Sequence, residues 1–251
     1  PIVLALAKHP MVEAYAFPKL KTIMSGAAPL GPELAEDCAR RLGCTVKQGY
    51  GLTETSPVTH LNPEPPGRVV PGSIGICIPN TECRIVDYKT GKDLGTGMQG
   101  ELWIRGPQVM RGYLNNEEAT NQTIDPEGWL KTGDIAEVDE DGYFKIVDRV
   151  KELIKYKGFQ VAPAELEALL LTHPSIADCA VVPAEDPEAG EIPVGFVVYK
   201  ENMVENPETI MEFIAQKVSP QKKIRRIIQI EQIPKSPSGK ILRRYLRDQI
   251  A

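Results

Sequence analysis

The sequence predicts a mixed fold, with the end of a layered α/β sheet domain, an antiparallel β subdomain and a small C-terminal α+β domain. Three observations support this prediction. Helix and strand patterns alternate over residues 1–60, which is typical of a layered, largely parallel sheet. From about residue 68 to 148, short apolar runs are separated by Gly, Pro and Asp, as in antiparallel sheets. After residue 148, helical periodicities and strand-like runs are interleaved.

The first region contains one clear amphipathic helix. Leu34, Cys38 and Leu42 recur at helical spacing, and Gly43 is expected to end the helix. A short strand around Thr45–Val46 should follow it. This helix and strand therefore form the expected α/β layer.

The middle region contains four strand-like runs, at residues 75–78, 82–86, 101–104 and 143–147. Asp141-Gly142 is a typical tight hairpin turn. In the last region, helices are predicted over about 163–172, over 207–218 and from 241 onward, with strands near 178–183, 192–199 and 225–231. We therefore expect two domains, residues 1–148 and 149–251.

Composition limits the location and the chemistry. No apolar run approaches the roughly 20 residues that a membrane helix needs. No signal peptide and no C-terminal peroxisomal tripeptide is visible, so a cytoplasmic location is expected, although the start at Pro1 without Met is consistent with a fragment. Five cysteines without C-x-x-C spacing favour a reducing compartment over zinc ligation or a disulfide framework, and the three histidines form no local cluster.

Charge is unevenly distributed along the chain. The net charge is −5, yet residues 220–251 contain nine Lys or Arg and two Asp or Glu. Such a basic tail is consistent with a nucleic-acid surface or with a solvated helix. Tyr245 is its only aromatic residue, so the stacking residues of a single-strand binder are scarce.

Two short motifs are misleading. Residues 95–100 spell G-x-G-x-x-G, but the dinucleotide fingerprint requires a helix to follow, and residues 101–104 look like a strand. Gly239-Lys240 lacks the remaining residues of a Walker A loop. Neither motif supports a nucleotide site by itself.

The stretch QGYGLTE, residues 48–54, is the first candidate site. Its glycines would let the backbone approach a flat ligand closely. Thr53 can donate to a phosphate oxygen, and Glu54 could hold a hard cation. A plain turn at the end of a strand explains the same residues.

The stretch WLKTGD, residues 129–134, is the second candidate. Asp134 in a Gly-containing turn could accept hydrogen bonds from neighbouring sugar hydroxyls. The alternative is an aspartate that only shapes its own turn.

Two lysine-bearing stretches follow. Lys151, Lys155 and Lys157 fall within seven residues, directly after Asp148-Arg149. Lys240 ends the loop PKSPSGK, where it resembles a point charge on a movable arm that suits a phosphate. Solvated lysines remain the alternative for both stretches.

In this order, QGYGLTE, WLKTGD, DRVKELIKYKGFQVAPAELE and PKSPSGK closely resemble the adenylate-forming acyl-CoA synthetases, the AMP-binding family that includes 4-coumarate–CoA ligase and firefly luciferase. The resemblance extends from SGAAPLG, residues 25–31, to the end of the chain. It implies a ligase that converts ATP and a carboxylic acid into an acyl-adenylate and then transfers the acyl group to CoA.

The resemblance also implies roles for individual residues. The implied ATP- and AMP-binding residues are Ala27, Gln48, Gly49, Thr53, Asp134, Arg149 and Lys151. The implied magnesium ligand is Glu54, the implied hinge is Asp148, and the implied catalytic lysines are Lys240 and Lys155. The implied CoA-binding residues are Lys157, Gly158 and Gln160. The C-terminal domain is expected to rotate between the two half-reactions.

Several alternatives stay open at this stage. The family's upstream phosphate loop is absent from these residues, so the chain is expected to be about the last half of an enzyme and inactive alone. An aryl acid and a fatty acid fit equally well as the substrate. A module that loads a carrier protein, a luciferase-type oxygenase, a catalytically dead relative and a nucleic-acid-binding tail are the rival interpretations. The oligomeric state cannot be inferred.

Overall fold

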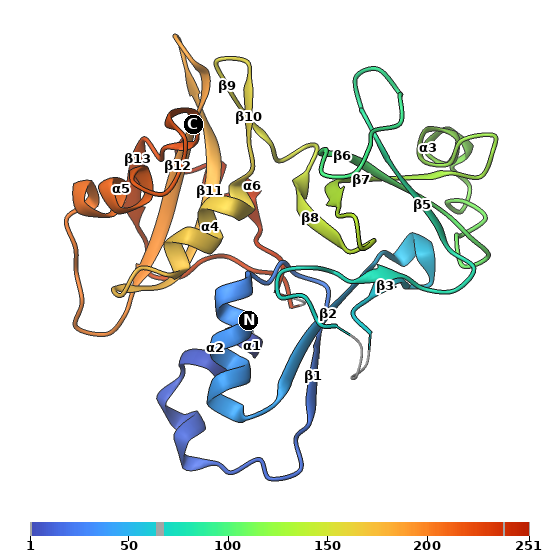
Figure 1. The fold of residues 1–251 in the computed structure, drawn as a ribbon. Helices are drawn as coiled ribbons and strands as arrows, with labels where there is room; N and C mark the ends of the chain where they lie inside the picture. Colours follow the sequence, from blue (N-terminus) through green and yellow to red (C-terminus); the bar gives the residue numbers. More distant parts are fainter. Residues whose placement is uncertain (1, 64–67, 238, 251) are drawn as a thin grey trace. The chain divides into compact units, whose positions relative to one another are not determined.

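The computed structural model describes residues 2–63, 68–237 and 239–250. The chain divides into two compact units, Pro1–Val147 and Asp148–Ala251. Figure 1 labels their helices and strands, and each unit is described below by itself.

The first sheet of unit 1 is built on a parallel pair joined by a helix. Its strand order is β1-β2-β3-β4, with β1 and β2 parallel and the other pairs antiparallel. The strands are β1 (Thr22–Ser25), β2 (Thr45–Gly51), β3 (Val58–Leu61) and β4 (Ile76–Cys77). The helices and 3-10 turns are α1 (Ile2–Lys8), η1 (Pro10–Ala14), α2 (Pro32–Leu42) and η2 (Thr53–Thr55).

Helix α2 forms where its apolar period predicts. Cys38 is fully buried, with Ala35 and Val46 beside it in one apolar cluster. Gly43 ends the helix in the left-handed conformation at φ 64°, which glycine adopts at little cost. The predicted α/β layer is confirmed.

The second sheet of unit 1 has the order β5-β6-β7-β8. Its strands are β5 (Glu82–Val86), β6 (Gly100–Arg105), β7 (Leu130–Val138) and β8 (Phe144–Arg149), and a short helix, α3 (Glu117–Thr123), precedes β7. Leu102 and Ile104 are fully buried and alternate with partly exposed residues of β6, as a half-buried strand requires. The residues after the G-x-G-x-x-G pattern thus form a strand, as predicted.

One local prediction for this sheet is wrong. WLKTGD was expected to form a turn, but all of it except Trp129 lies inside β7. The register against β6 shifts between Glu101 and Trp103, so that β7 accommodates extra residues there as a β-bulge. Gly133, at φ 71°, supplies the left-handed backbone of the bulge.

Unit 2 is a five-stranded sheet covered by helices. Its strand order is β10-β9-β12-β11, and β13 pairs with β12. The strands are β9 (Ile154–Tyr156), β10 (Phe159–Val161), β11 (Ile176–Asp186), β12 (Gly190–Tyr199) and β13 (Arg226–Gln229). The helical elements are α4 (Pro163–Leu171), α5 (Pro207–Ala215), η3 (Pro220–Lys222) and α6 (Arg243–Arg247).

Two apolar clusters hold unit 2 together. Leu166 and Leu170 of α4 are fully buried with residues of α5 in the first cluster. Leu246 of α6 is fully buried with Phe196 in the second. The helices and strands predicted for this region are present, whereas the hairpin β9–β10 was not predicted.

None of the helices among the described residues is both long and apolar enough to span a bilayer.

Candidate functional site

Within unit 1, the structure joins two of the sequence motifs through one buried hydrogen bond. The Tyr50 hydroxyl, on β2, donates to Oδ2 of Asp134, on β7, at 2.5 Å. Asp134 is only 4% exposed. The contact links QGYGLTE with WLKTGD across 84 residues of sequence, and it links the two sheets of unit 1.

The β7 bulge determines where Asp134 lies. The Thr132 hydroxyl donates to the Leu102 carbonyl at 2.7 Å and accepts from the Asp134 backbone N–H at 3.1 Å. The Gly133 N–H donates to the Glu101 carboxylate at 2.9 Å. These bonds fix the backbone on both sides of the aspartate, so its carboxylate is pre-positioned.

Gln48, on β2, has a structural role. Its side-chain amide is buried and donates to the Leu30 carbonyl at 3.1 Å, which fixes the loop after β1. The Gln48 carbonyl in turn accepts from the side chain of buried Asn62 at 3.2 Å. Asn62, which no sequence pattern indicated, thereby supports the β2 edge of the site.

Gly49 and Ala27 lie where the loop after β1 meets β2. A Cβ on Gly49 would come within 2.6 Å of the Met24 side chain and 3.1 Å of the His60 carbonyl. The close approach that glycine permits here is thus to the chain itself. Ala27 is exposed and has φ 71°, a strained conformation for a residue with a side chain.

In the turn Thr53–Thr55, one residue has a structural role and the other two are accessible to solvent. Thr55 is buried, and its hydroxyl bonds the backbone of Leu52 and Pro57. Thr53 is exposed and Glu54 is partly exposed. Tyr113 donates its hydroxyl to Oε1 of Glu54 at 2.8 Å, and this hydrogen bond, together with burial, raises the pKa of the tyrosine.

Glu54 fits the requirements of a magnesium site. Its backbone carbonyl accepts from the Met110 N–H at 2.8 Å, which anchors the residue. Mg²⁺ takes one or two carboxylate oxygens and keeps waters or substrate phosphates as its other ligands. A partly exposed carboxylate that accepts one hydrogen bond, from Tyr113, keeps further lone pairs for such an ion.

In unit 2, the lysine cluster forms a two-residue hairpin. Lys157 and Gly158 have φ of 46° and 83°, the left-handed pair that a tight hairpin turn needs. Lys155 on β9 pairs directly with Gln160 on β10, and both side chains are exposed. The hairpin is attached at Tyr156, which pairs with the first residue of β12.

Asp148 is buried at the first position of unit 2. Its carboxylate accepts from the Arg149 N–H at 2.7 Å and from the Ala164 N–H, in the first turn of α4, at 2.8 Å. It therefore caps α4, whose own N-cap residue Ala162 has no side-chain acceptor. Burial raises the pKa of Asp148 to about 6.

Arg243 is the central residue of a cluster of charged side chains that interacts with Asp148. Its side chain is 11% exposed, donates from both terminal nitrogens to Glu167, and also donates to the Val181 carbonyl. The Glu152 carboxylate lies 3.8 Å from its Nε. No sequence pattern indicated this role, because Arg243 resembles the other residues of a solvated basic tail.

Lys240 lies on a loop that turns back on itself. The Ser236 N–H donates to the Lys240 carbonyl at 2.9 Å, and the Leu242 N–H donates to the Pro234 carbonyl at 2.8 Å. The Lys240 side chain is exposed. Lys235, at the start of the loop, bonds Asp178 at 2.6 Å.

The hairpin and the Lys240 loop are attached to different ends of the β11–β12 ribbon. Tyr156 of the hairpin pairs with Gly190, beside the ribbon's turn, whereas Lys235 is bonded near the start of β11. Asp178 and Asp186 are eight residues apart on β11, so the two attachment points are separated by roughly 25 Å at the usual rise of a strand. Figure 1 shows the hairpin at the upper end of unit 2. Lys155 and Lys240 are not brought together.

Four basic residues of the tail are engaged inside unit 2. Lys222 bonds Glu165, and Lys235 bonds Asp178. Arg225 donates to backbone carbonyls and lies 4.8 Å from the Tyr156 ring centroid. Arg243 bonds Glu167 and the Val181 carbonyl, as described above.

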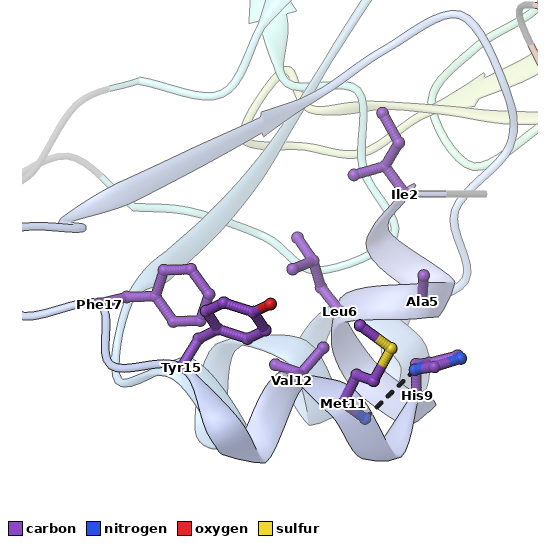
Figure 2. A pocket seen from close by; sticks show the side chains of 8 residues that line it. All are labelled: Ile2, Ala5, Leu6, His9, Met11, Val12, Tyr15 and Phe17. Carbon is purple, nitrogen blue, oxygen red and sulfur yellow. Dashed lines mark hydrogen bonds between the residues drawn. The ribbon is translucent and has the colours of Figure 1, made fainter.

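One apolar hollow lies apart from the candidate residues. It measures about 500 Å³ and is lined by α1, η1 and the segment after them. Figure 2 shows the side chains of Leu6, Val12, Tyr15 and Phe17 around it, with the His9 ring accepting from the Met11 N–H. No candidate ligand-binding residue lines this hollow.

Comparisons with known proteins show the family of the chain. Residues 1–114 match the model of the AMP-binding enzymes, and residues 165–240 match the model of the AMP-binding enzyme C-terminal domain. The chain belongs to the AMP-binding enzyme family. Its fold, a mixed α/β structure with several sheets, is that of adenylate-forming ligases.

The curated relatives point to one branch of the family. The chain is 53% identical to 4-coumarate-CoA ligase 2 of Narcissus pseudonarcissus and to 4-coumarate–CoA ligase 2 of Nicotiana tabacum, and all of it aligns with 45% and 47% of those proteins. It superposes on an anthranilate CoA ligase in complex with anthranoyl-AMP with a TM-score of 0.90 at 27% identity, covering 99% of this chain and 48% of that one. The chain thus spans about half the length of the relatives that it matches.

Proposed function

We propose that this chain is part of an AMP-forming carboxylic acid–CoA ligase similar to the 4-coumarate–CoA ligases. The hydrogen bond between Tyr50 and Asp134 carries the proposal, because it brings two of the four motifs into one pre-positioned site. The relatives at 53% identity, all named as CoA ligases of the same acid, support CoA as the acceptor over a carrier protein.

The first half-reaction forms a mixed anhydride. A carboxylate oxygen of the acid attacks the α-phosphorus of ATP, and the bond to pyrophosphate breaks. In this proposal Asp134 accepts hydrogen bonds from the ribose hydroxyls, and Tyr50 holds the aspartate in place. Arg149 contacts the same ribose, while Gln48, Gly49 and Ala27 border the acyl-adenylate.

Lys240 supplies charge to this step. The transition state carries negative charge on the phosphate oxygens, and a lysine placed there stabilises it electrostatically. Thr53 contacts a phosphate oxygen, and Glu54 would hold Mg²⁺. When bound, the ion neutralises part of the phosphate charge.

The second half-reaction forms the thioester. The CoA sulfur attacks the acyl carbon, and AMP leaves with the electron pair of the cleaved C–O bond. Lys151 and Lys155 contact the adenylate in this step, while Lys157, Gly158 and Gln160 border the CoA channel. The distance between the two lysine elements of unit 2 supports a rotation about Asp148 that presents each in turn.

An ATP–pyrophosphate exchange assay on a graft tests the proposal. The graft substitutes these 251 residues for the matching 47% of the Nicotiana tabacum relative. We expect acid-dependent exchange with a panel of aryl and fatty acids, and CoA-dependent release of AMP with the best acid. A folded graft that exchanges with no acid, while the parent tobacco enzyme does, would refute the ligase assignment.

A further inference from the structure

We propose that His60, Cys77 and Cys83 form a binding site for a thiophilic divalent cation, zinc foremost, that links the two sheets of unit 1. The Nε2 atom of His60 lies 3.4 Å from Sγ of Cys77 and 3.4 Å from Sγ of Cys83. The two sulfur atoms are 2.9 Å apart. Three donor atoms of the kinds that zinc prefers thus converge on one point.

The sequence pointed away from such a site. It contains no C-x-x-C spacing, and its histidines form no local cluster, so zinc ligation was not expected. That expectation overlooked strand pairing, because His60 on β3 is the register partner of Cys77 on β4. A four-residue turn then returns the chain to Cys83 on β5. Ligands on adjacent antiparallel strands need no short spacing.

The geometry is close to that of a tetrahedral zinc site. With zinc about 2.3 Å from sulfur and about 2.0 Å from nitrogen, neighbouring ligand atoms lie roughly 3.5–3.8 Å apart. Both observed nitrogen–sulfur distances of 3.4 Å are near that range. The sulfur–sulfur distance must widen by less than about 1 Å, a change within the reach of one side-chain rotation.

The environment of His60 accommodates the tautomer that a metal site needs. The Thr59 oxygen lies 3.0 Å from Nδ1 of His60, and the Thr59 hydroxyl lies 3.4 Å from the Tyr50 carbonyl. The threonine can thus accept the Nδ1 proton while it donates its own to that carbonyl. In this tautomer the lone pair of Nε2 is available to an ion between the two sulfurs. A second hydrogen bond of this kind is the usual support for a metal-bound histidine.

Packing also holds the donors in place. His60 is fully buried, and its ring meets Phe144 edge-on, with 4.5 Å between the ring centroids. Cys77 and Cys83 are partly exposed, so an ion and a fourth ligand such as water can reach the site. Thiolate sulfur favours zinc over magnesium or calcium, which prefer oxygen donors.

The site has a structural consequence near the catalytic motifs. His60 and Cys77 belong to the first sheet and Cys83 to the second, so a bound ion would add a link between the sheets to the Tyr50–Asp134 bond and the Gly75–Phe144 backbone bridge. The His60 ring also contacts Tyr50, with centroids 5.9 Å apart. This site is independent of the ligase proposal, because it uses none of the residues assigned to substrates.

Zinc titration of the reduced, metal-free chain is the direct test. We expect one equivalent to bind, to raise the unfolding midpoint reported by Trp103 and Trp129 in unit 1, and to give a thiolate charge-transfer band when Co²⁺ replaces Zn²⁺. Cys77→Ser and Cys83→Ser should each lower the affinity at least tenfold. Cys44→Ser is the matched control, since Cys44 is also partly exposed in unit 1, and it should bind as the wild type does.

Alkylation of the wild-type chain gives a test that does not depend on the folding of variants. Zinc should protect Cys77 and Cys83 from a maleimide but leave Cys44 reactive, as read by peptide mass spectrometry. Equal labelling of all three with and without zinc would contradict the proposal. So would a Cys77–Cys83 disulfide in the oxidised chain combined with no zinc uptake by the reduced one, because the pair would then be a redox site only.

Discussion

The two units present their candidate residues in opposite ways. In unit 1 the central groups are buried and hydrogen-bonded, with Asp134 at 4% and Gln48 at 8% exposure. In unit 2 the candidate lysines Lys155 and Lys240 are exposed on a hairpin and a loop. The difference indicates that the fold holds the central side chains of unit 1 in place, whereas the two lysines of unit 2 lie at the surface.

Loss of Lys240 should give the largest effect on catalysis. In the graft, Lys240→Ala should slow ATP–pyrophosphate exchange by about 10²–10³-fold, the usual result of removing one preorganised charge from a transition state. Lys217→Ala, which removes an exposed lysine of the same unit, is the matched control.

If Lys240→Ala left exchange within twofold of the parent graft, the charge assigned to the loop would lie elsewhere. Unit 2 would then have no demonstrated part in the first half-reaction, although the buried Tyr50–Asp134 contact of unit 1 would be unaffected.

Asp148 makes the stability of unit 2 depend on pH. Burial raises its pKa to about 6 from the ordinary 3.8, so between these values the folded state holds a proton that the unfolded state has lost. Its contribution to the unfolding free energy is thus fully present below pH 3.8 and falls as pH rises through 6, by about 1–3 kcal/mol. Arg243 and Glu167 are the charged side chains that face it from α6 and α4.

Asp148→Asn removes this titration. The difference in unfolding free energy between variant and wild type should therefore shift in the variant's favour between pH 4.5 and 7.5 by a similar amount. Urea unfolding followed by circular dichroism measures it. Both tryptophans lie in unit 1, so their fluorescence reports that unit separately and should not respond to the substitution. A difference that is flat over this range would contradict the raised pKa.

The sequence predicted the backbone better than the side-chain contacts. Helix α2 and its end at Gly43 follow from apolar period and glycine chemistry, which are local. The partnership of Tyr50 with Asp134 is not local, because it depends on how two sheets pack. Arg243 was misjudged for the same reason, since its hydrogen-bond partners lie on α4 and β11 rather than in the tail.

The WLKTGD stretch shows a different limit. A glycine beside an aspartate is typical of a turn, and the sequence offers no sign that the strand continues on both sides. In the structure the same glycine forms a bulge, which requires a left-handed residue just as a turn does. Local chemistry identified the unusual backbone but could not tell which of its two uses applied.

The Tyr50–Asp134 pair offers a way to test the organisation of unit 1. Tyr50→Phe removes the donor and leaves a buried carboxylate short of one partner, which should lower the unfolding free energy of unit 1 by about 1–3 kcal/mol. Asp134→Asn and the double variant complete a cycle, with an expected coupling of about 0.5–3 kcal/mol. Tryptophan fluorescence during urea unfolding gives all four values. Additive effects would mean that the two motifs are adjacent without being coupled.

A substitution in the hairpin of unit 2 should have the smallest effect on catalysis. Only one of the two half-reactions should slow. Lys155→Ala in the graft should slow the transfer of a preformed acyl-adenylate to CoA about tenfold, the cost of one exposed charged hydrogen bond. Pyrophosphate exchange should be unchanged, because Lys155 is attached at the far end of the ribbon from the Lys240 loop. Lys145→Ala, an exposed strand lysine in unit 1, is the control. Equal losses in both half-reactions would mean that one arrangement of the units serves both, and the separation of roughly 25 Å between the two attachment points would then have no catalytic meaning.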